Sequence, residues 1–240
     1  MLEAEYMRAA IYFSPAAGHE LSRCAARWLS RDPWSGTDVP RREEEGHGAA
    51  AGLADLDAIT AEPRRYGFHA TLKPPFRLAE GATVDRLRGA LAEFCIRPSI
   101  LVPRLSLARL GSFFALIPAG DVPALSVLAA DAVRAFDRFR APSTEVEIAR
   151  RRPERLTPRQ RAYLADWGYP YVFDEFRFHM TLTGPVPPDR HDAVEGLLRS
   201  RFAGFIGAEL RVDAVCLFVE PSPPGDFVVD TAVPLAGPPG

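Results

Sequence analysis

The sequence contains few cysteines, and the three that it has, Cys24, Cys95 and Cys216, are far apart. Each lies in an apolar stretch, which is typical of buried thiols in a reducing compartment and argues against a disulfide or cysteine–zinc framework. The sequence also lacks a His-Glu-x-x-His signature and a glycine-rich fingerprint that opens a helix after a strand. We therefore expect no metal and no cofactor.

Long apolar runs and an excess of charge of one sign are also missing. No run reaches the roughly 18 apolar residues that a membrane span needs. The net charge of −2 argues against a long nucleic acid as partner, because domains that bind one are usually strongly basic. The acidic N-terminal residues do not resemble a signal peptide. These features predict a cytoplasmic protein that acts on a small molecule and has no membrane partner, and they leave the oligomeric state open.

The most informative feature that is present is a repeated phrase. Residues 68–72 read Phe-His-Ala-Thr-Leu and residues 178–182 read Phe-His-Met-Thr-Leu, 110 positions apart (179 − 69). A proline follows each copy at the same offset, Pro75 and Pro185. An internal repeat at about half the chain length indicates two related halves.

The hydrophobic pattern around each copy predicts the same order of elements, namely strand, helix, strand and strand. We therefore predict an α+β fold in which residues 1–240 form one bilobal domain. Two β-sheets with flanking helices would surround a central cleft with pseudo-two-fold symmetry. One lobe would carry the His69 motif and the other the His179 motif, and strands could be exchanged between the lobes. We expect the motif strands over residues 65–72 and 175–183, each ended by proline.

Alternation along a strand puts every second side chain on one face. In the first copy this parity groups His69, Thr71 and Lys73, and in the second it groups Arg177, His179 and Thr181. The intervening apolar residues would anchor each strand in the core. The sequence thus predicts one cleft that holds two imidazoles, two hydroxyls and two cations.

Such a set of groups suits cleavage of a phosphodiester without a metal. Imidazole titrates near neutral pH, so one histidine can accept a proton while the other donates one. Thr71 and Thr181 can donate hydrogen bonds to phosphate oxygens, and Lys73 and Arg177 would add positive charge. Which histidine is the base and which is the acid stays open.

These paired motifs resemble those of the 2H phosphoesterase superfamily, whose signature is two His-x-Thr motifs on facing strands of a bilobal α+β fold. Three longer stretches, residues 65–76, 136–142 and 167–173, look like the bacterial branch associated with phosphonate metabolism and carbon–phosphorus lyase genes. The resemblance implies a cyclic phosphodiesterase acting on a 2′,3′-cyclic nucleotide or a ribose cyclic phosphate. A non-catalytic phosphate- or phosphonate-binding protein, or an RNA-end ligase or transferase of the same fold, is the alternative.

Two further positions are candidates for the lining of the cleft. Tyr12 ends the first expected strand, although a half-buried strand tyrosine is the commoner case. Arg140 opens a basic connector that also contains the run Arg150–Arg152. We interpret that run as solvated, and a flap that recruits phosphate is the alternative.

Overall fold

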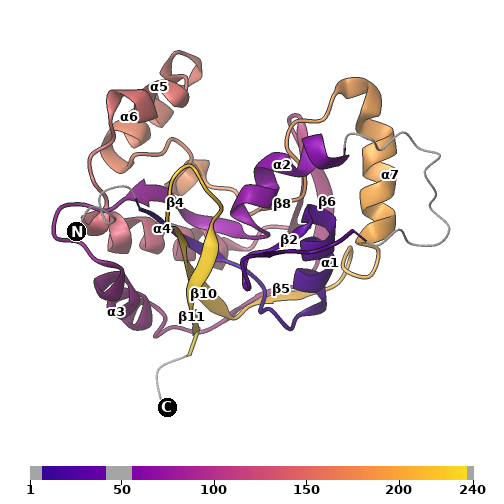
Figure 1. Cartoon of the computed structure of the whole chain (residues 1–240), viewed down its shortest axis with the longest axis horizontal. Coiled ribbons are helices and arrows are strands. Elements are labelled where there is room, and N and C mark those ends of the chain that lie inside the picture. Colours follow the sequence, from indigo (N-terminus) through magenta and orange to yellow (C-terminus); the bar gives the residue numbers. More distant parts are fainter. Residues whose placement is uncertain (1–6, 42–55, 237–240) are drawn as a thin grey trace.

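The computed structural model describes residues 7–41 and 56–236 and confirms the α+β class (Figure 1). Its centre is a seven-stranded sheet in the order β11-β10-β1-β4-β8-β7-β6, in which every recorded pair is antiparallel. In chain order these strands are β1 (Arg8–Phe13), β4 (Ala70–Arg77), β6 (Leu105–Leu110), β7 (Phe113–Pro118), β8 (Met180–Thr181), β10 (Ala214–Glu220) and β11 (Val228–Pro234).

Two short strand pairs lie outside this sheet, and helices surround it. The strand pairs are β2 (Arg31–Asp32) with β3 (Thr37–Asp38) and β5 (Ile100–Val102) with β9 (Leu210–Val212). The helices are α1 (Glu20–Leu29), α2 (Leu56–Tyr66), α3 (Val84–Phe94), α4 (Pro123–Phe136), α5 (Glu145–Arg150), α6 (Pro158–Trp167) and α7 (His191–Arg201). Within the described ranges, no helix combines the length and the apolar character that a membrane crossing requires.

The side chains of β1 alternate between two apolar clusters on opposite faces of the sheet. Ala9, Ile11 and Phe13 point into the large apolar core, which also contains residues of α1, α3, α4 and α7. Ala10 and Tyr12 point the other way, into a small cluster with residues of β10. The alternation of β1 therefore anchors the sheet on one face and leaves the second face for other groups.

The two motif strands are neighbours in one sheet, whereas we expected them on two separate sheets. β4 and β8 pair antiparallel through Ala70 and Met180, which are equivalent positions of the repeat. A local two-fold axis therefore passes between these two residues. On the β8 side the sheet continues into β7 and β6, which come from the first half of the sequence, and β10 and β11 from the second half pair on the β4 side. The halves thus exchange strands.

β4 runs through Pro74 and Pro75, although we expected these prolines to end the strand. Its pairing with β1 shifts register twice. Tyr12 pairs with Thr71, Ile11 pairs with Lys73, and Ala9 pairs with Phe76. Such a shift is a β-bulge, which inserts one extra residue and reverses the facing of the residues after it. On the β8 side only Ala70 is paired, so the missing N–H groups of the prolines cost little there.

The bulge turns Lys73 away from the histidines, so the predicted grouping by parity is wrong at this position. The Lys73 ammonium is buried, donates to Asp137 Oδ1 at 3.0 Å and to the Val133 carbonyl at 3.2 Å, and thereby joins β4 to the end of α4. Burial lowers the pKa of Lys73, whereas the hydrogen bond to Asp137 opposes that shift. Lys73 ties the sheet to α4 and does not line the cleft face.

Because Lys73 is the single lysine of the chain, its burial can be tested by chemical labelling. We expect an amine-reactive ester to leave Lys73 unmodified in the folded protein and to modify it fully in concentrated urea, as measured by peptide mass spectrometry. Rapid labelling of Lys73 in the native protein would place its ammonium in the cleft and contradict the bulge.

The second motif strand is much shorter than the predicted 175–183. Only Met180 and Thr181 form β8, and residues 173–175 form a 3-10 turn that Phe173 enters with a φ of 55°. The sequence pattern predicts a short helix over residues 53–60; α2 begins at Leu56 and extends to Tyr66, and residues 53–55 lie outside the described residues. The polar stretch 31–48, with its prolines and glycines, predicts a loop; up to residue 41 it contains β2 and β3, and the rest of it lies outside the described residues.

Residues 144–176 form a segment that we call the cap, which contains α5 and α6. In Figure 1 these two helices project at the opposite end of the molecule from α7. Capping boxes begin both helices, at Thr144 and Thr157. Arg77 of β4 forms an ion pair with Glu147, and Arg140 donates to the Asp166 carbonyl at 2.9 Å. These contacts hold the cap against the edge of the cleft.

Candidate active site

The two motif histidines are held in the same way by the backbone. His69 Nδ1 lies 2.8 Å from the Gly67 carbonyl, and His179 Nδ1 lies 2.7 Å from the Arg177 carbonyl. Since a carbonyl oxygen only accepts, Nδ1 carries the proton in both rings, and each Nε2 is left with a lone pair. The repeat thus fixes the same ring nitrogen, Nδ1, to the backbone in both motifs and leaves Nε2 for other contacts.

The register of β4 and β8 sets the relative position of the two rings. The two strands pair at Ala70 and Met180, and extending that register by one residue on each side sets His69 against Thr181 and Thr71 against His179. The two histidines are then diagonal neighbours on one face, a relation that typically separates Cα atoms by about 7–8 Å. The charge of His179 lowers the pKa of His69, which is consistent with this proximity. Two imidazoles and two hydroxyls therefore surround one small area.

Buried contacts fix the backbone of both motifs. The Ser14 hydroxyl donates to the Phe68 carbonyl at 2.8 Å in the first motif. The Trp28 indole donates to the Leu182 carbonyl at 2.7 Å in the second. Phe68 and Leu182 themselves are core residues. The apolar face of each motif thus anchors the strand, as the alternation predicted.

The environments of the two histidines differ. The His69 ring stacks on Tyr12, with centroids 3.8 Å apart, and its Nε2 accepts from the Thr71 hydroxyl at 3.2 Å. Burial lowers the pKa of His69 to about 4. Burial also lowers the pKa of His179, whose nearest recorded ring is Phe113 at 5.9 Å. Burial thus favours the neutral form of both rings.

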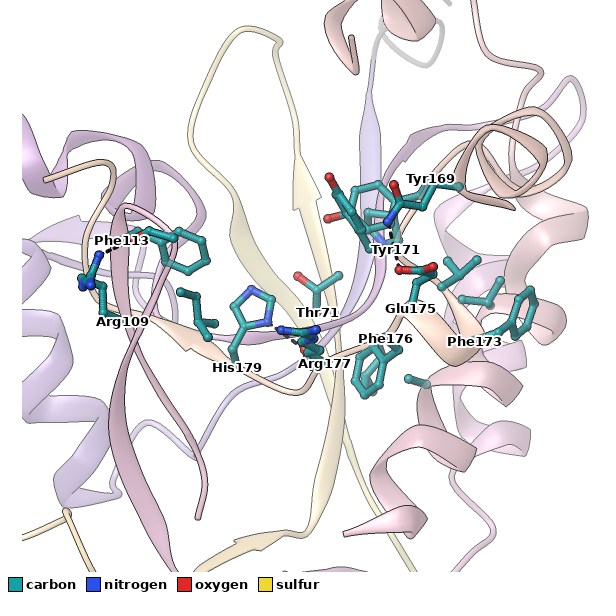
Figure 2. Close-up of a pocket in the computed structure, with 18 residues that line it drawn as sticks. Thr71, Arg109, Phe113, Tyr169, Tyr171, Phe173, Glu175, Phe176, Arg177 and His179 are labelled. Carbon is teal, nitrogen blue, oxygen red and sulfur yellow. Dashed lines mark hydrogen bonds between the residues drawn. The ribbon is translucent and has the colours of Figure 1, made fainter. Parts of the chain in front are cut away.

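Two adjoining cavities meet at this place. The first, of about 520 Å³, is lined by His179, Thr71 and Arg177 together with aromatic residues of the cap (Figure 2). The second, of about 300 Å³, is lined by His69, Thr71 and Thr181. Both cavities share four lining residues, Thr71, Pro74, Phe113 and Tyr169. A single ligand can therefore contact both histidines and extend to either side.

The predicted site residues are thus only partly brought together. His69, His179, Thr71, Thr181 and Arg177 line the two cavities. Figure 2 shows the Arg177 side chain beside Thr71 and His179. Tyr12, a candidate for the lining, is in the wall of the smaller cavity, where it supports His69.

Arg140, the other candidate for the lining, lies elsewhere. Its guanidinium pairs with Asp137, with Nε 2.8 Å from Oδ1, and also donates to the Asp166 carbonyl. Asp137 is the same carboxylate that Lys73 contacts, and this pairing holds the pKa of Asp137 below its usual value although burial acts to raise it. Arg140 therefore fastens the base of the cap and does not face the cavities.

Several lining residues were missed by sequence reasoning. They come from the β6–β7 hairpin, the start of β1, the end of α2 and the cap, so no local pattern groups them. Arg151 belongs to the run that we interpreted as solvated. Of the missed residues, only Arg151 had been considered for the cleft, through the alternative that this run is a flap that recruits phosphate. The set comprises Arg8, Tyr66, Arg109, Phe113, Arg151 and Tyr169.

The two cavities carry a positive charge balance. Four arginines, Arg8, Arg109, Arg151 and Arg177, line them, against the two glutamates Glu62 and Glu175, which gives a formal balance of +2 (4 − 2). This balance favours an anionic ligand, although the chain as a whole is slightly acidic. Within the described ranges, no three or more His, Cys, Asp or Glu residues are grouped so that they could hold a metal ion.

Comparison with known proteins identifies relatives of this chain. A family model described as "Protein of unknown function (DUF1045)" matches residues 71–228. A protein of Janthinobacterium sp. (strain Marseille) named "Ribose 1,5-bisphosphate phosphokinase PhnN" is 36% identical over 235 residues, which cover 96% of this chain and 51% of that protein. One of Laribacter hongkongensis (strain HLHK9) with the same name is 35% identical over 90% of this chain and 48% of its own length.

The chain therefore spans about half the length of these curated relatives. Among solved structures, one titled "Crystal structure of phosphoesterase" aligns over 96% of this chain and 98% of its own, with a TM-score of 0.43 and 11% sequence identity.

Proposed function

The chain belongs to the DUF1045 family, and from its site we propose that it is a metal-independent phosphoesterase of small cyclic phosphodiesters. The observation that carries the proposal is a pair of histidines that are held alike through Nδ1 and flank the point, Ala70 with Met180, where the two motif strands pair. The repeated His-x-Thr motif and its resemblance to 2H phosphoesterases support the same reaction class.

In the proposed reaction, one imidazole takes a proton from water while the water oxygen forms a bond to phosphorus. The bond from phosphorus to one ester oxygen of the ring breaks, and the second imidazole, protonated at the start, donates its proton to that oxygen. Thr71 and Thr181 donate to the non-bridging oxygens, and Arg177 offsets the negative charge that grows on them. The product is a phosphomonoester with a free hydroxyl beside it.

The names of the curated relatives favour a ribose cyclic phosphate over a cyclic nucleotide. Opening of a cyclic phosphate that includes O1 of a ribose 5-phosphate gives a ribose 1,5-bisphosphate, the compound in those names. Together with the resemblance to the phosphonate-associated branch, this suggests a role in phosphonate metabolism. Because Lys73 is buried and flanked by leucine and proline, the chain lacks the lysine loop of P-loop kinases, and we do not propose kinase activity for it.

The test is turnover in the presence of excess chelator. Purified protein should convert ribose 1,2-cyclic phosphate or a 2′,3′-cyclic nucleotide to the phosphomonoester, as followed by phosphorus NMR. Binding of phosphate ligands without any turnover would favour the alternative of a non-catalytic binding protein. Turnover that strictly requires an added metal would overturn the proposed mechanism, and joining of two ends would indicate the ligase alternative.

The two threonines give a graded test of phosphate contact. Thr71→Val and Thr181→Val should each lower kcat/KM by about 10- to 100-fold, because each removes one hydrogen bond to a charged oxygen. Thr71→Ser and Thr181→Ser are the matched controls and should retain most of the activity. Valine variants that are as active as the parent would show that these hydroxyls do not contact the reacting phosphate.

A further inference from the structure

Arg151 brings an unneutralised positive charge to the His69 side of the cleft. It directly follows α5 and lines the smaller cavity together with His69 and Tyr12. Its guanidinium lies over the Tyr169 ring, 4.8 Å from the centroid. Within the described part of the chain it forms no ion pair, although many other arginines do. A ligand in this cavity would therefore meet a cation that no carboxylate occupies.

Arg8, at the start of β1, adds a second cation whose position is fixed. Its Nε pairs with Glu220, a fully buried carboxylate that also accepts from Arg65 and from the Gly225 N–H. Two guanidinium groups on one carboxylate leave a net positive charge. The Arg8 guanidinium also lies over the Phe227 ring, at 5.4 Å from its centroid. Arg8 thus presents donors to the cavity from a rigid support.

The rest of the wall includes three tyrosines and three threonines. Tyr66 and Tyr169 line the cavity, and their hydroxyls are suited to hydrogen bonds with an anion. One carboxylate, Glu62, lies beside Gly184, where a Cβ would be 3.8 Å from its Oε2. Two cations therefore face one carboxylate in this cavity.

The backbone of the cap is strained next to these residues. Arg152 adopts a left-handed conformation with a φ of 49°, which redirects the chain just after Arg151. Phe173, which lines the larger cavity at the other end of the cap, is also left-handed. Left-handed residues other than glycine are uncommon and cluster at functional sites. The turn at Arg152 directly follows Arg151, which lines the cavity.

From these observations, and resting on the proposed phosphoesterase activity, we propose that Arg8 and Arg151 form a second anion subsite. This subsite binds a phosphomonoester that the substrate carries in addition to its cyclic phosphodiester. The histidines and threonines hold the reacting phosphate, and the two guanidinium groups hold the other with bidentate, charge-assisted hydrogen bonds. The substrate class is therefore a doubly phosphorylated ribose, with a cyclic phosphate at one end of the sugar and a phosphate on O5.

The test compares matched substrates that differ only in the phosphate on O5. We use ribose 1,2-cyclic phosphate and adenosine 2′,3′-cyclic phosphate, each with and without that phosphate. The parent should prefer the phosphorylated member of a pair by about 30-fold in kcat/KM, the size expected for charge-assisted hydrogen bonds. Arg151→Gln should remove most of this preference, and Arg151→Lys should keep part of it.

Arg150→Gln is the matched control, because Arg150 has the same charge, is exposed and does not line either cavity. It should keep the full preference. Equal loss of preference in both glutamine variants would indicate only a general effect of charge and overturn the subsite.

The substrate comparison distinguishes failure of the second subsite from failure of the proposed phosphoesterase activity. Equal turnover of both members of each pair by the parent would disprove the second subsite and leave the phosphoesterase intact. Turnover of no substrate would disprove the phosphoesterase, and calorimetry with ribose 5-phosphate would then decide the subsite. Binding by the parent and the Arg150→Gln variant but not by the Arg151→Gln variant would support it, and equal or absent binding would reject it.

Discussion

Replacing either motif histidine with alanine should lower kcat/KM for a cyclic phosphodiester by about 1,000-fold, within the range for loss of a general acid or base. His69→Ala removes the ring that stacks on Tyr12, and His179→Ala removes the ring opposite Thr71. The measurement is steady-state kinetics in excess chelator, with circular dichroism and thermal unfolding to confirm the fold of each variant.

The double variant distinguishes a cooperating pair from two independent contributions. If one ring accepts a proton while the other donates one, loss of the first already removes most of the benefit of the second. The double variant should therefore be about as slow as the worse single variant, not about a million-fold slower than the parent.

His19→Ala is the control for the loss of an imidazole as such. His19 lies away from the cavities and caps α1, where its Nδ1 accepts from the Leu21 N–H at 3.1 Å. Its loss should cost about 1 kcal/mol of stability, as for other helix N-caps, and leave kcat/KM unchanged. A folded His69→Ala or His179→Ala variant with the activity of the parent would disprove the shared acid–base site.

The sequence predicted that the two motifs lie together because the repeat and the sheet share one symmetry. The offset between the motifs relates Ala70 to Met180, and these are the residues that pair at the junction of β4 and β8. Strand parity then put His69 and Thr71 on the open face, and buried neighbours confirm that the other face is anchored. Both conclusions depend only on local periodicity and on the repeat.

The same parity failed at Lys73 because its orientation is set by a partner far away in the sequence. The bulge that turns it inward arises where β4 pairs with β1, about sixty residues earlier, and nothing in the motif itself encodes it. Once inside, the ammonium needs a carboxylate, and Asp137 at the end of α4 supplies one. A buried ion pair of this kind depends on tertiary packing and cannot be read from alternation.

The arginines of the cleft show a second limit of sequence reasoning. Arg140 and Arg151 lie in the same basic connector, yet one pairs with Asp137 and the other lines the smaller cavity. We expected Arg140 to line the cleft and the run that contains Arg151 to be solvated, and the structure places them the other way round. The capping boxes at Thr144 and Thr157 define the helices of the cap, but the way in which the cap lies against the sheet decides which arginine reaches the cleft.

The pH dependence of kcat/KM should lie on the acidic side of the ordinary titration range of histidine. Burial lowers the pKa of both rings, that of His69 to about 4, and the hydrogen bonds from Nδ1 to the backbone carbonyls oppose the shift without cancelling it. Because the rings are close, they titrate as a pair whose apparent pKa values belong to the site as a whole.

The direction of the pH dependence on each side of the optimum follows from the charge state that each histidine needs for the reaction. One ring must be neutral to accept a proton, so activity is lost as the pH falls below the lower pKa of the pair. The other must be protonated to donate, so activity is lost as the pH rises above the upper pKa. Burial lowers the pKa of both rings, so both limbs of the profile shift toward acidic pH. Both values lie below the unperturbed pKa of about 6.5.

We therefore expect kcat/KM to peak below pH ~6.5 and to fall about 100-fold over the next two pH units, tenfold for each. At saturating substrate the bound phosphate anion favours protonated imidazole, so the profile of kcat should break at a higher pH than that of kcat/KM. A profile of kcat/KM that rises steadily to alkaline pH would mean that hydroxide or a metal-bound water attacks phosphorus. The protonated ring would then have no part in the reaction, and the proposed acid–base pair of histidines would be wrong.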